Sequence, residues 1–235
     1  MRLLTAPDRP PSDAELSEDD LRELYAVPRH PWVRANMVAT VDGAAAGDSG
    51  RSGSINNDVD RRVFALLRSS ADAVVVGAGT ARAEGYRPTD RPIVLVSRRG
   101  EVPERLRDAA PGQVLLATCA AAEGLEAARE TLGDEHVLVL GSHRVDLARL
   151  ADELAGRGLA DLLCEGGPHL LRDLLDQGVL DELCQTVVPR LVGGTHPRIL
   201  DGPPVDAGLR LHVLLEHDGT LLGRWLVDPP GWAKS

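Results

Sequence analysis

The sequence has little lysine, few aromatic residues and no long apolar run. Lys234 is the only lysine, and aromatic side chains make up 3% of the chain. No apolar run approaches the roughly 18 residues that a membrane-spanning helix needs. The N-terminal stretch also lacks the apolar core of a secretory signal peptide. We therefore expect a cytoplasmic protein that is neither secreted nor inserted in a membrane.

The sequence also lacks the residue spacing of a metal site. Cys119, Cys164 and Cys184 lie far apart, and no CxxC motif or zinc-type Cys/His pattern occurs. Three thiols without a disulfide pattern suit a reducing compartment, and we expect no bound metal. There is no Walker motif, and Gly77-Ala78-Gly79 does not complete a Rossmann fingerprint because Arg82 stands at the third glycine position.

The charge balance excludes a further class of partner. The chain has 235 residues, 26 basic and 36 acidic, which gives a net charge of −10. Such a protein should repel nucleic acid and anionic lipid, although a local basic pocket can still bind a small anion. The 43% of hydrophobic residues suits a soluble globular domain. We expect that domain over residues 31–229, after an N-terminal surface arm over 1–30 and before a tail over 230–235.

Apolar runs typical of strands alternate with amphipathic helical segments along this domain. Strands are predicted at WVRANMVATV, ADAVVVG, RPIVLVS, QVLLATC, HVLVLG, LADLLC and DELCQTVV. Their alternation with helices predicts an α/β fold with a mostly parallel sheet and helices on both faces. Asp218-Gly219 separates two further alternating segments, which predicts an antiparallel hairpin and makes the sheet mixed.

Ligands of open α/β sheets bind at the carboxyl ends of the parallel strands, so the residues after the strands are the first candidates. Three of these turns carry glycine, which lets the backbone approach a phosphate beside a helix N-terminus. Two such turns in one sheet indicate a nucleotide with more than one phosphate, whereas a single turn is explained as well by tight packing. Glu165 indicates a functional site more strongly than these turns do, because a carboxylate at the end of a buried strand needs a partner or a ligand.

Other charged residues at this edge have a functional and a structural explanation. Ser97 and Arg98 follow a strand and suit an adenosine 2′-phosphate, or they form a solvated turn. Asp42 precedes a glycine, as a turn residue often does. Arg68 ends a helix, where positive charge is favourable in any case. No Ser/His/Asp constellation is evident.

Six short motifs occur in order over roughly residues 33–227. They are Thr40-Val41-Asp42-Gly43, Leu67-Arg68, the run from Asp72 to Thr80, Glu165-Gly166-Gly167-Pro168, Asp181-Glu182-Leu183 and the run from Pro189 to Gly193. Together they resemble the reductase domain of riboflavin biosynthesis, which follows a pyrimidine deaminase domain in the bifunctional enzymes. The zinc signature of the deaminase is absent, so the chain resembles the reductase half alone.

The resemblance implies a dihydrofolate-reductase-like three-layer fold and NADPH as hydride donor. It implies reduction of the ribosyl group of a phosphoribosylamino-pyrimidine, of the 5-amino-6-(5-phosphoribosylamino)uracil type, to a ribityl chain. The cofactor-binding residues that it implies are Gly77, Thr80, Ser97, Arg98, Glu165, Gly166, Gly167, Pro168, His169 and Leu170. The implied substrate-binding residues are Asn36, Asp42, Arg68 and Glu84, and the catalytic candidates are Glu165 and then Asp42.

Three positions depart from the family pattern near the expected substrate. Ala44 stands where many members have Lys or Arg, Ser54 where many have Trp, and Glu84-Gly85-Tyr86 where Asp-Asp-Pro is usual. These departures leave open a reductase of another heterocycle, such as dihydrofolate, and a nucleotide-binding module without turnover. The ring can carry a 2-amino or a 2-oxo group. An exposed edge of the C-terminal hairpin would favour aggregation, so we expect a homodimer, as the resemblance also implies.

Overall fold

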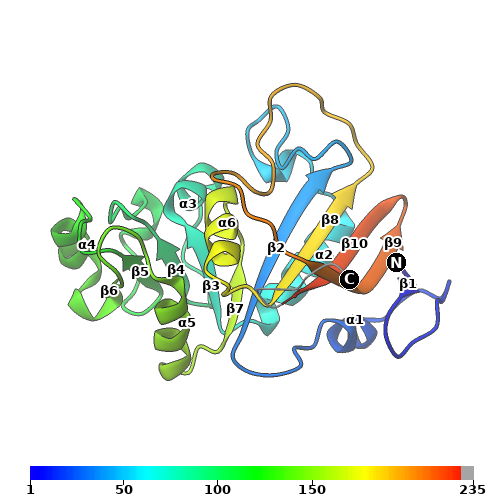
Figure 1. Ribbon diagram of the computed structural model, residues 1–235, viewed down its shortest axis with the longest axis horizontal. Coiled ribbons are helices and arrows are strands. Elements are labelled where there is room, and N and C mark those ends of the chain that lie inside the picture. Colours follow the sequence, from blue (N-terminus) through cyan, green and yellow to red (C-terminus); the bar gives the residue numbers. More distant parts are fainter. Residues whose placement is uncertain (229–235) are drawn as a thin grey trace.

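The computed structural model describes residues 1–228 and shows a ten-stranded sheet between two layers of helices (Figure 1). The strands are β1 (Arg2–Thr5), β2 (Trp32–Thr40), β3 (Ala73–Gly77), β4 (Ile93–Val96), β5 (Val114–Thr118), β6 (Val137–Val139), β7 (Asp161–Cys164), β8 (Glu182–Val188), β9 (Leu209–His217) and β10 (Thr220–Val227). The helices are α1 (Glu18–Leu24), α2 (Asp58–Ser70), α3 (Ala78–Glu84), α4 (Leu125–Leu132), α5 (Leu147–Gly156) and α6 (Pro168–Asp176). The predicted tail over 230–235 lies outside the described residues.

The sheet has the strand order β1-β9-β10-β8-β2-β7-β3-β4-β5-β6. Neighbouring strands are parallel from β8 to β6. The other three pairs are antiparallel: β8 with β10, β10 with β9, and β9 with β1. The β9–β10 turn has positive φ at both Asp218 (46°) and Gly219 (79°), as a tight hairpin turn with the right twist requires. The prediction of a mostly parallel, mixed sheet with a C-terminal hairpin is therefore confirmed.

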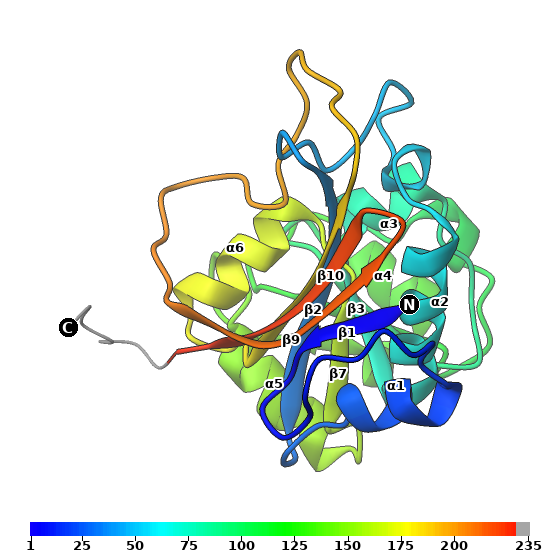
Figure 2. The same ribbon diagram turned by 90° about the vertical axis from the view of Figure 1, so that its right-hand side faces the viewer.

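Helices cover both faces of this sheet, with α5 and α6 on one side and α1 to α4 on the other (Figure 2). Strands in the middle are apolar on both sides: Ile93, Val94 and Leu95 of β4 are all 0% exposed. Such continuous apolar runs are what a strand between two helical layers needs. The three-layer α/β fold class expected from the sequence is confirmed.

The N-terminal segment is part of the sheet rather than a surface arm. Strand β1 pairs antiparallel with β9, and Met1, Leu3 and Leu21 are 2%, 3% and 0% exposed. The Ser17 side chain caps the start of α1. The prediction of a surface arm is wrong because the edge of β9 takes up β1 as a partner, and the apolar residues between the acidic ones pack underneath.

A cluster of buried charges joins α1 to the sheet. Glu182 of β8 is fully buried and accepts hydrogen bonds from Arg34 Nε at 2.7 Å and Arg224 Nη2 at 2.9 Å. The same carboxylate accepts from Trp32 Nε1 at 3.0 Å. The two guanidiniums also donate to the carbonyls of Leu24, Tyr25 and Ala26. We call Arg34, Glu182 and Arg224 the core ion cluster.

Two kinds of feature are missing from residues 1–228. No helix there is both long and apolar enough to cross a membrane. No group of His, Cys, Asp or Glu side chains in that part of the chain is arranged to hold a metal ion.

Candidate functional site

Two clefts open at the carboxyl ends of the parallel strands, the edge at which the sequence predicts a ligand. The α6 cleft, about 590 Å³ in volume, lies between the β3–α3 turn, the loop after β4 and the start of α6. The α2 cleft, about 360 Å³, lies between α2, the end of β2 and α3. Thr80, Gly167 and Pro168 line both clefts and form a shared wall. The two clefts are therefore adjacent.

The shared wall depends on glycine. A Cβ atom on Gly167 would lie 2.3 Å from Thr80 Oγ1, so any other residue would force the Thr80 side chain to move. Gly166 has a φ of +90°, a conformation that L side chains rarely adopt. These contacts explain why the Glu165-Gly166-Gly167-Pro168 turn needs both of its glycines.

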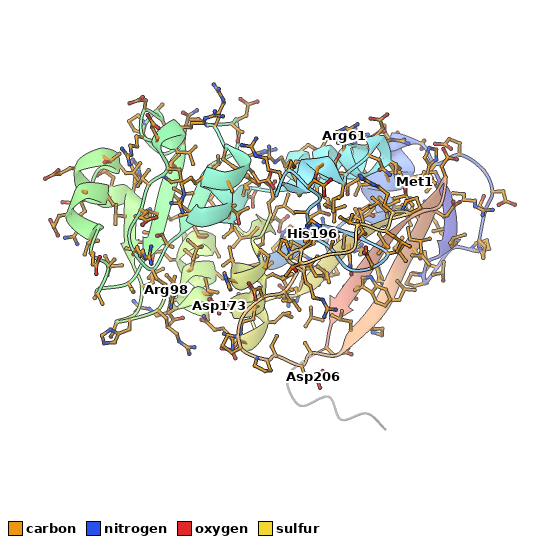
Figure 3. All side chains as sticks on the ribbon, turned by 90° about the horizontal axis from the view of Figure 1, so that it is seen from above. Met1, Arg61, Arg98, Asp173, His196 and Asp206 are labelled. Atoms are coloured by element: carbon orange, nitrogen blue, oxygen red, sulfur yellow. The ribbon has the colours of Figure 1, made fainter. Side chains whose placement is uncertain are left out.

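Backbone turns and exposed arginines line the α6 cleft. Helix α3 begins after Gly77 and α6 after Gly167, neither with a side-chain cap, so the first N–H groups of each helix have no cap to bind. Arg98 is exposed and forms no ion pair within residues 1–228. Figure 3 shows Arg98 near Asp173 of α6 and well apart from Arg61 of α2, with His196 between. The cleft thus offers an anion both backbone donors and a free guanidinium.

The structure brings most of the predicted cofactor-binding residues to this cleft. Those that line it are Gly77, Thr80, Ser97, Arg98, Gly167, Pro168, His169 and Leu170. Glu165 and Gly166 do not line it: Glu165 faces the α2 cleft instead. Their predicted contact with a cofactor has no support in this geometry.

Helix α2 forms one wall of the α2 cleft. Asp60, Phe64 and Arg68 follow one another at a spacing of four residues, which places them on one face of the helix, and all three line the cleft. Across from them lie Asn36 of β2 and Glu84 of α3. Three of the four predicted substrate-binding residues, Asn36, Arg68 and Glu84, therefore meet in one cavity.

Glu165 has the partner that its burial requires. Its side chain is 2% exposed and accepts from Arg68 Nε at 2.5 Å and Nη2 at 2.6 Å. Tyr86 Oη donates to the same carboxylate at 2.5 Å. Burial and the Glu165 carboxylate raise the pKa of Tyr86, and the bond to Glu165 raises the pKa of Arg68. We call Arg68, Tyr86 and Glu165 the cleft ion cluster.

Aromatic rings fix the position of Arg68 in this cluster. Its guanidinium carbon lies 4.7 Å from the centre of the Phe64 ring and 5.6 Å from that of Tyr86. Both distances are within the range of a cation–π contact. The guanidinium is thus held between two rings and a carboxylate, and 32% of the side chain remains exposed to the cleft.

Sequence reasoning missed Tyr86 as a site residue, although a signal for it was present. Tyr86 stands in the segment that departs from the family pattern, and it lies 79 positions from Glu165 in the chain. In the same segment, Glu84 accepts from the backbone N–H and hydroxyl of Ser52 at 2.9 and 3.0 Å. The departure at 84–86 therefore creates contacts inside the α2 cleft in addition to the turn that ends α3.

Asp42 lies outside both clefts. Its carboxylate accepts from the Thr40 hydroxyl at 2.5 Å and from the backbone N–H of Val192 and Gly193 at 3.1 and 2.7 Å. These bonds lower the pKa of Asp42 to about 2. The predicted catalytic and substrate-binding roles of Asp42 do not fit this position, because the carboxylate instead joins two loops above β2 and β8.

Comparison with known proteins gives a consistent result. Residues 31–220 match the family of the RibD C-terminal domain. A 2,5-diamino-6-ribosylamino-4(3H)-pyrimidinone 5′-phosphate reductase from Methanothermobacter thermautotrophicus is 33% identical over 190 residues, which cover 75% of this chain and 86% of that protein. A protein of the same name from Archaeoglobus fulgidus is 30% identical over 193 residues, 73% of this chain and 87% of that one.

Two solved structures share the fold. A pyrimidine reductase-like protein from Corynebacterium diphtheriae has a TM-score of 0.76 at 24% identity, over 88% of this chain and 98% of that one. The riboflavin biosynthesis reductase Rib7 of Saccharomyces cerevisiae has a TM-score of 0.67 at 13% identity, with the same two coverages of 88% and 98%.

Proposed function

The chain belongs to the RibD C-terminal domain family, and from this premise we propose that it is an NADPH-dependent reductase of a ribosylaminopyrimidine 5′-phosphate. The proposed reaction converts the ribosyl group to a ribityl chain. One observation carries it: a cleft suited to a nucleotide and a second cleft lined by carboxylates share the wall formed by Thr80, Gly167 and Pro168. The relatives from Methanothermobacter thermautotrophicus and Archaeoglobus fulgidus are named as reductases of a ribosylaminopyrimidinone 5′-phosphate, and this similarity supports the substrate class.

The α6 cleft fits a dinucleotide with a 2′-phosphate. The Gly167 backbone packs against the Thr80 side chain, and the start of α6 beside it has no side-chain cap, so its backbone N–H groups would bind a pyrophosphate. Ser97 and Arg98 lie farther along the same cleft and would hold the 2′-phosphate. When bound, the cofactor supplies a hydride from its nicotinamide ring. Thr80 and Pro168 would place that ring at the shared wall.

The α2 cleft would hold the substrate in its open-chain form. Opening of the ribose transfers the glycosylamine N–H proton to the ring oxygen and leaves a C1′=N double bond. The C1′=N nitrogen takes a proton from water, which gives an iminium ion, and the hydride then adds to C1′ and leaves a neutral amine. Positive charge on the C1′=N group makes C1′ a better hydride acceptor, and the Glu165 carboxylate at the end of the shared wall stabilises that charge. Arg68 and Tyr86 act as positioning residues that fix the carboxylate.

The function is tested by the oxidation of NADPH with each candidate substrate and by mass spectrometry of the product. We expect oxidation with a ribosylaminopyrimidine 5′-phosphate and a product heavier by two hydrogens. Oxidation with dihydrofolate alone would favour the reductase of another heterocycle. NADPH binding without turnover on any of these compounds would favour the non-catalytic module.

The preference for NADPH over NADH depends on Arg98. A charge-assisted bond to phosphate contributes about 1.5–3 kcal/mol, so Arg98→Ala should raise the Kd of NADPH about tenfold or more. The Kd of NADH should not change, because NADH has no 2′-phosphate. Arg99→Ala is the matched control, because Arg99 already has an ion-pair partner: its Nη1 atom lies 3.8 Å from Glu101 Oε1. The control should leave the Kd of NADPH near the wild-type value. Equal affinity of the wild type for NADPH and NADH would remove Arg98 from this role.

We also propose a homodimer in the cytoplasm, but on a different basis from the hairpin edge. That edge is covered, because β1 pairs with β9. Instead, the hairpin face opposite α1 and α2 is apolar: Leu209 and Leu221 are 40% and 37% exposed, and Trp225 is half-buried beside them. A contiguous apolar face on a monomer favours association. Light scattering at about twice the chain mass of 25.1 kDa would support the dimer, and a value at the chain mass would exclude it.

A further inference from the structure

Asp60 is a buried carboxyl group of the α2 cleft whose hydrogen-bonding capacity is mostly unused. The residue is 4% exposed and lies in the first turn of α2, where its backbone N–H donates to Asn57 Oδ1 at 3.1 Å. Burial raises the pKa of Asp60, and the nearby Thr186 on β8 opposes that rise in part. Within residues 1–228, Asp60 has no ion-pair partner, because the nearby Arg61 bonds to Asn56 and Asp58 instead.

The other carboxylates of this cleft already accept hydrogen bonds from neighbouring protein groups. Asp60, Glu84 and Glu165 are the acidic residues that line it, and Arg68 is the basic one. Glu165 is bonded by Arg68 and Tyr86, and Glu84 by Ser52. Both bonds to Glu84 end on its Oε1 atom, and Glu84 is half-buried. Asp60 is thus the buried carboxylate of the cleft that has no ion pair, and it has lone pairs left for a ligand. A ligand with two adjacent N–H donors would satisfy both of its oxygens at once.

The two forms of the pyrimidine differ at such an edge. A 2-amino-4(3H)-pyrimidinone presents the N3–H and the 2-amino N–H side by side, which are two donors. The 2-oxo ring presents the N3–H beside a carbonyl oxygen, which is one donor and one acceptor. A carboxylate accepts both bonds from the first form, whereas it accepts one bond from the second and is repelled by the O2 lone pairs.

We propose that Asp60 binds the N3–H and 2-amino edge of the substrate and so makes the enzyme specific for the 2-amino pyrimidine over its 2-oxo, deaminated form. This inference rests on the proposed function, since it needs a pyrimidine in the α2 cleft. The ring would then lie between β2 and the first turns of α2, next to Asn36 and Phe64. The ribosyl group would extend from there toward Glu165 and the shared wall.

The test is a comparison of kcat/KM for the 2,5-diamino-pyrimidinone and the 5-amino-uracil substrates. For the wild type, we expect the 2-amino substrate to be preferred by about ten- to a hundredfold, because one charge-assisted hydrogen bond is lost and a repulsion is added with the 2-oxo ring. Asp60→Asn changes two acceptors to one acceptor and one donor, which matches the 2-oxo edge. That variant should lose most of its activity on the 2-amino substrate and keep or gain activity on the 2-oxo substrate.

The control variant and the possible outcomes distinguish a failure of this inference from a failure of the proposed function. Asp58→Asn makes the same chemical change two residues earlier on α2, where the side chain is 96% exposed, and it should leave the preference at the wild-type value. Equal kcat/KM of the wild type for both substrates would overturn the inference while the proposed function stands. So would an equal loss on both substrates in Asp60→Asn. No turnover of either substrate by the wild type would instead contradict the proposed function.

Discussion

The molecule contains two buried glutamates that are paired with arginine, and their surroundings differ in the number and in the exposure of the arginine side chains. In the core ion cluster, Glu182 is fully buried between Arg34 and Arg224, whose side chains are 6% and 3% exposed. In the cleft ion cluster, Glu165 is 2% exposed, but Arg68 is 32% exposed and lines a cavity. A glutamate is paired with arginine at both places, but Arg34 of the core cluster borders a small pocket of about 70 Å³, whereas Arg68 and Glu165 line the α2 cleft of about 360 Å³.

This difference separates a structural from a functional use of the same ion pair. Burial alone would raise the pKa of Glu182, but Arg34 and Arg224 hold it below its ordinary value. Other donors of those guanidiniums bind the carbonyls of Leu24, Tyr25 and Ala26 at the end of α1. At Glu165, the Tyr86 hydroxyl takes the place of the second arginine, so one side of the cluster stays open. We expect substitutions in the core cluster to change stability and substitutions in the cleft cluster to change kinetics.

The largest effect should come from the core cluster. Glu182→Ala leaves two buried guanidiniums without a counter-charge, which should lower the free energy of unfolding by about 3–5 kcal/mol. For a domain of this size, that corresponds to a fall in Tm of about 10 °C. The kcat of the protein that remains folded should stay near the wild-type value. A change in KM or kcat without a fall in Tm would break the comparison.

Glu165→Gln should show the reverse pattern. The amide keeps the shape but removes the negative charge that favours the protonated C1′=N group before the hydride is transferred, so kcat should fall about a hundredfold. Circular dichroism on heating should give a Tm within a few degrees of the wild type, because an amide oxygen still accepts from Arg68 or Tyr86. A full kcat in this variant would remove Glu165 from the reaction.

A pair of matched substitutions sharpens the comparison further. Arg68→Lys keeps the charge but loses the two-pronged contact with Glu165, so kcat/KM should fall about tenfold. Arg34→Lys makes the same change in the core cluster and should lower the free energy of unfolding by about 1–3 kcal/mol with little change in kcat/KM. If Arg68→Lys lowered stability as Arg34→Lys does and left kinetics alone, Arg68 would be a second structural arginine.

The smallest effect is expected at Asp42, a third carboxylate, which is held by backbone N–H groups outside both clefts. Asp42→Asn should keep kcat/KM within about twofold of the wild type. The pKa of Asp42 is lowered to about 2. The carboxylate therefore stabilises the folded protein at any pH above the ordinary pKa of an aspartate, and this stabilisation is lost as the pH falls toward 2. Melting curves of wild type and variant should therefore differ near neutral pH and converge in acid. A large loss of activity would restore the catalytic role predicted from the sequence.

Local patterns predicted much of the fold, because they act over a few residues. Valine runs bounded by glycine gave β3, and Asp218-Gly219 gave the hairpin between β9 and β10. The pairing of β1 with β9 could not be predicted, since it joins Arg2 to Glu216 and depends on which edge of the sheet is left free. Long-range pairing of this kind has no signature in the residues around it.

The site divides in the same way. The glycine turns and Arg98 were predicted because each follows a strand, and parallel strands end at one edge. The contact between Tyr86 and Glu165 and the burial of Asp60 arise from how α2 and α3 pack over the sheet. Asp60 carries no local signal, because an acidic residue in the first turn of a helix is explained by the helix dipole alone. The structure is what shows it facing a cavity.

The central claim is that the two clefts bring a nicotinamide and a ribosylaminopyrimidine together at their shared wall. The most direct measurement uses NADPH that carries deuterium at the transferable C4 position of the nicotinamide ring. Incubation with the 2,5-diamino-6-ribosylamino-pyrimidinone 5′-phosphate and the enzyme should give a ribityl product with one deuterium, at C1′, by mass spectrometry and NMR. A reduced product without deuterium at C1′, or the absence of a reduced product from either pyrimidine, would contradict the account.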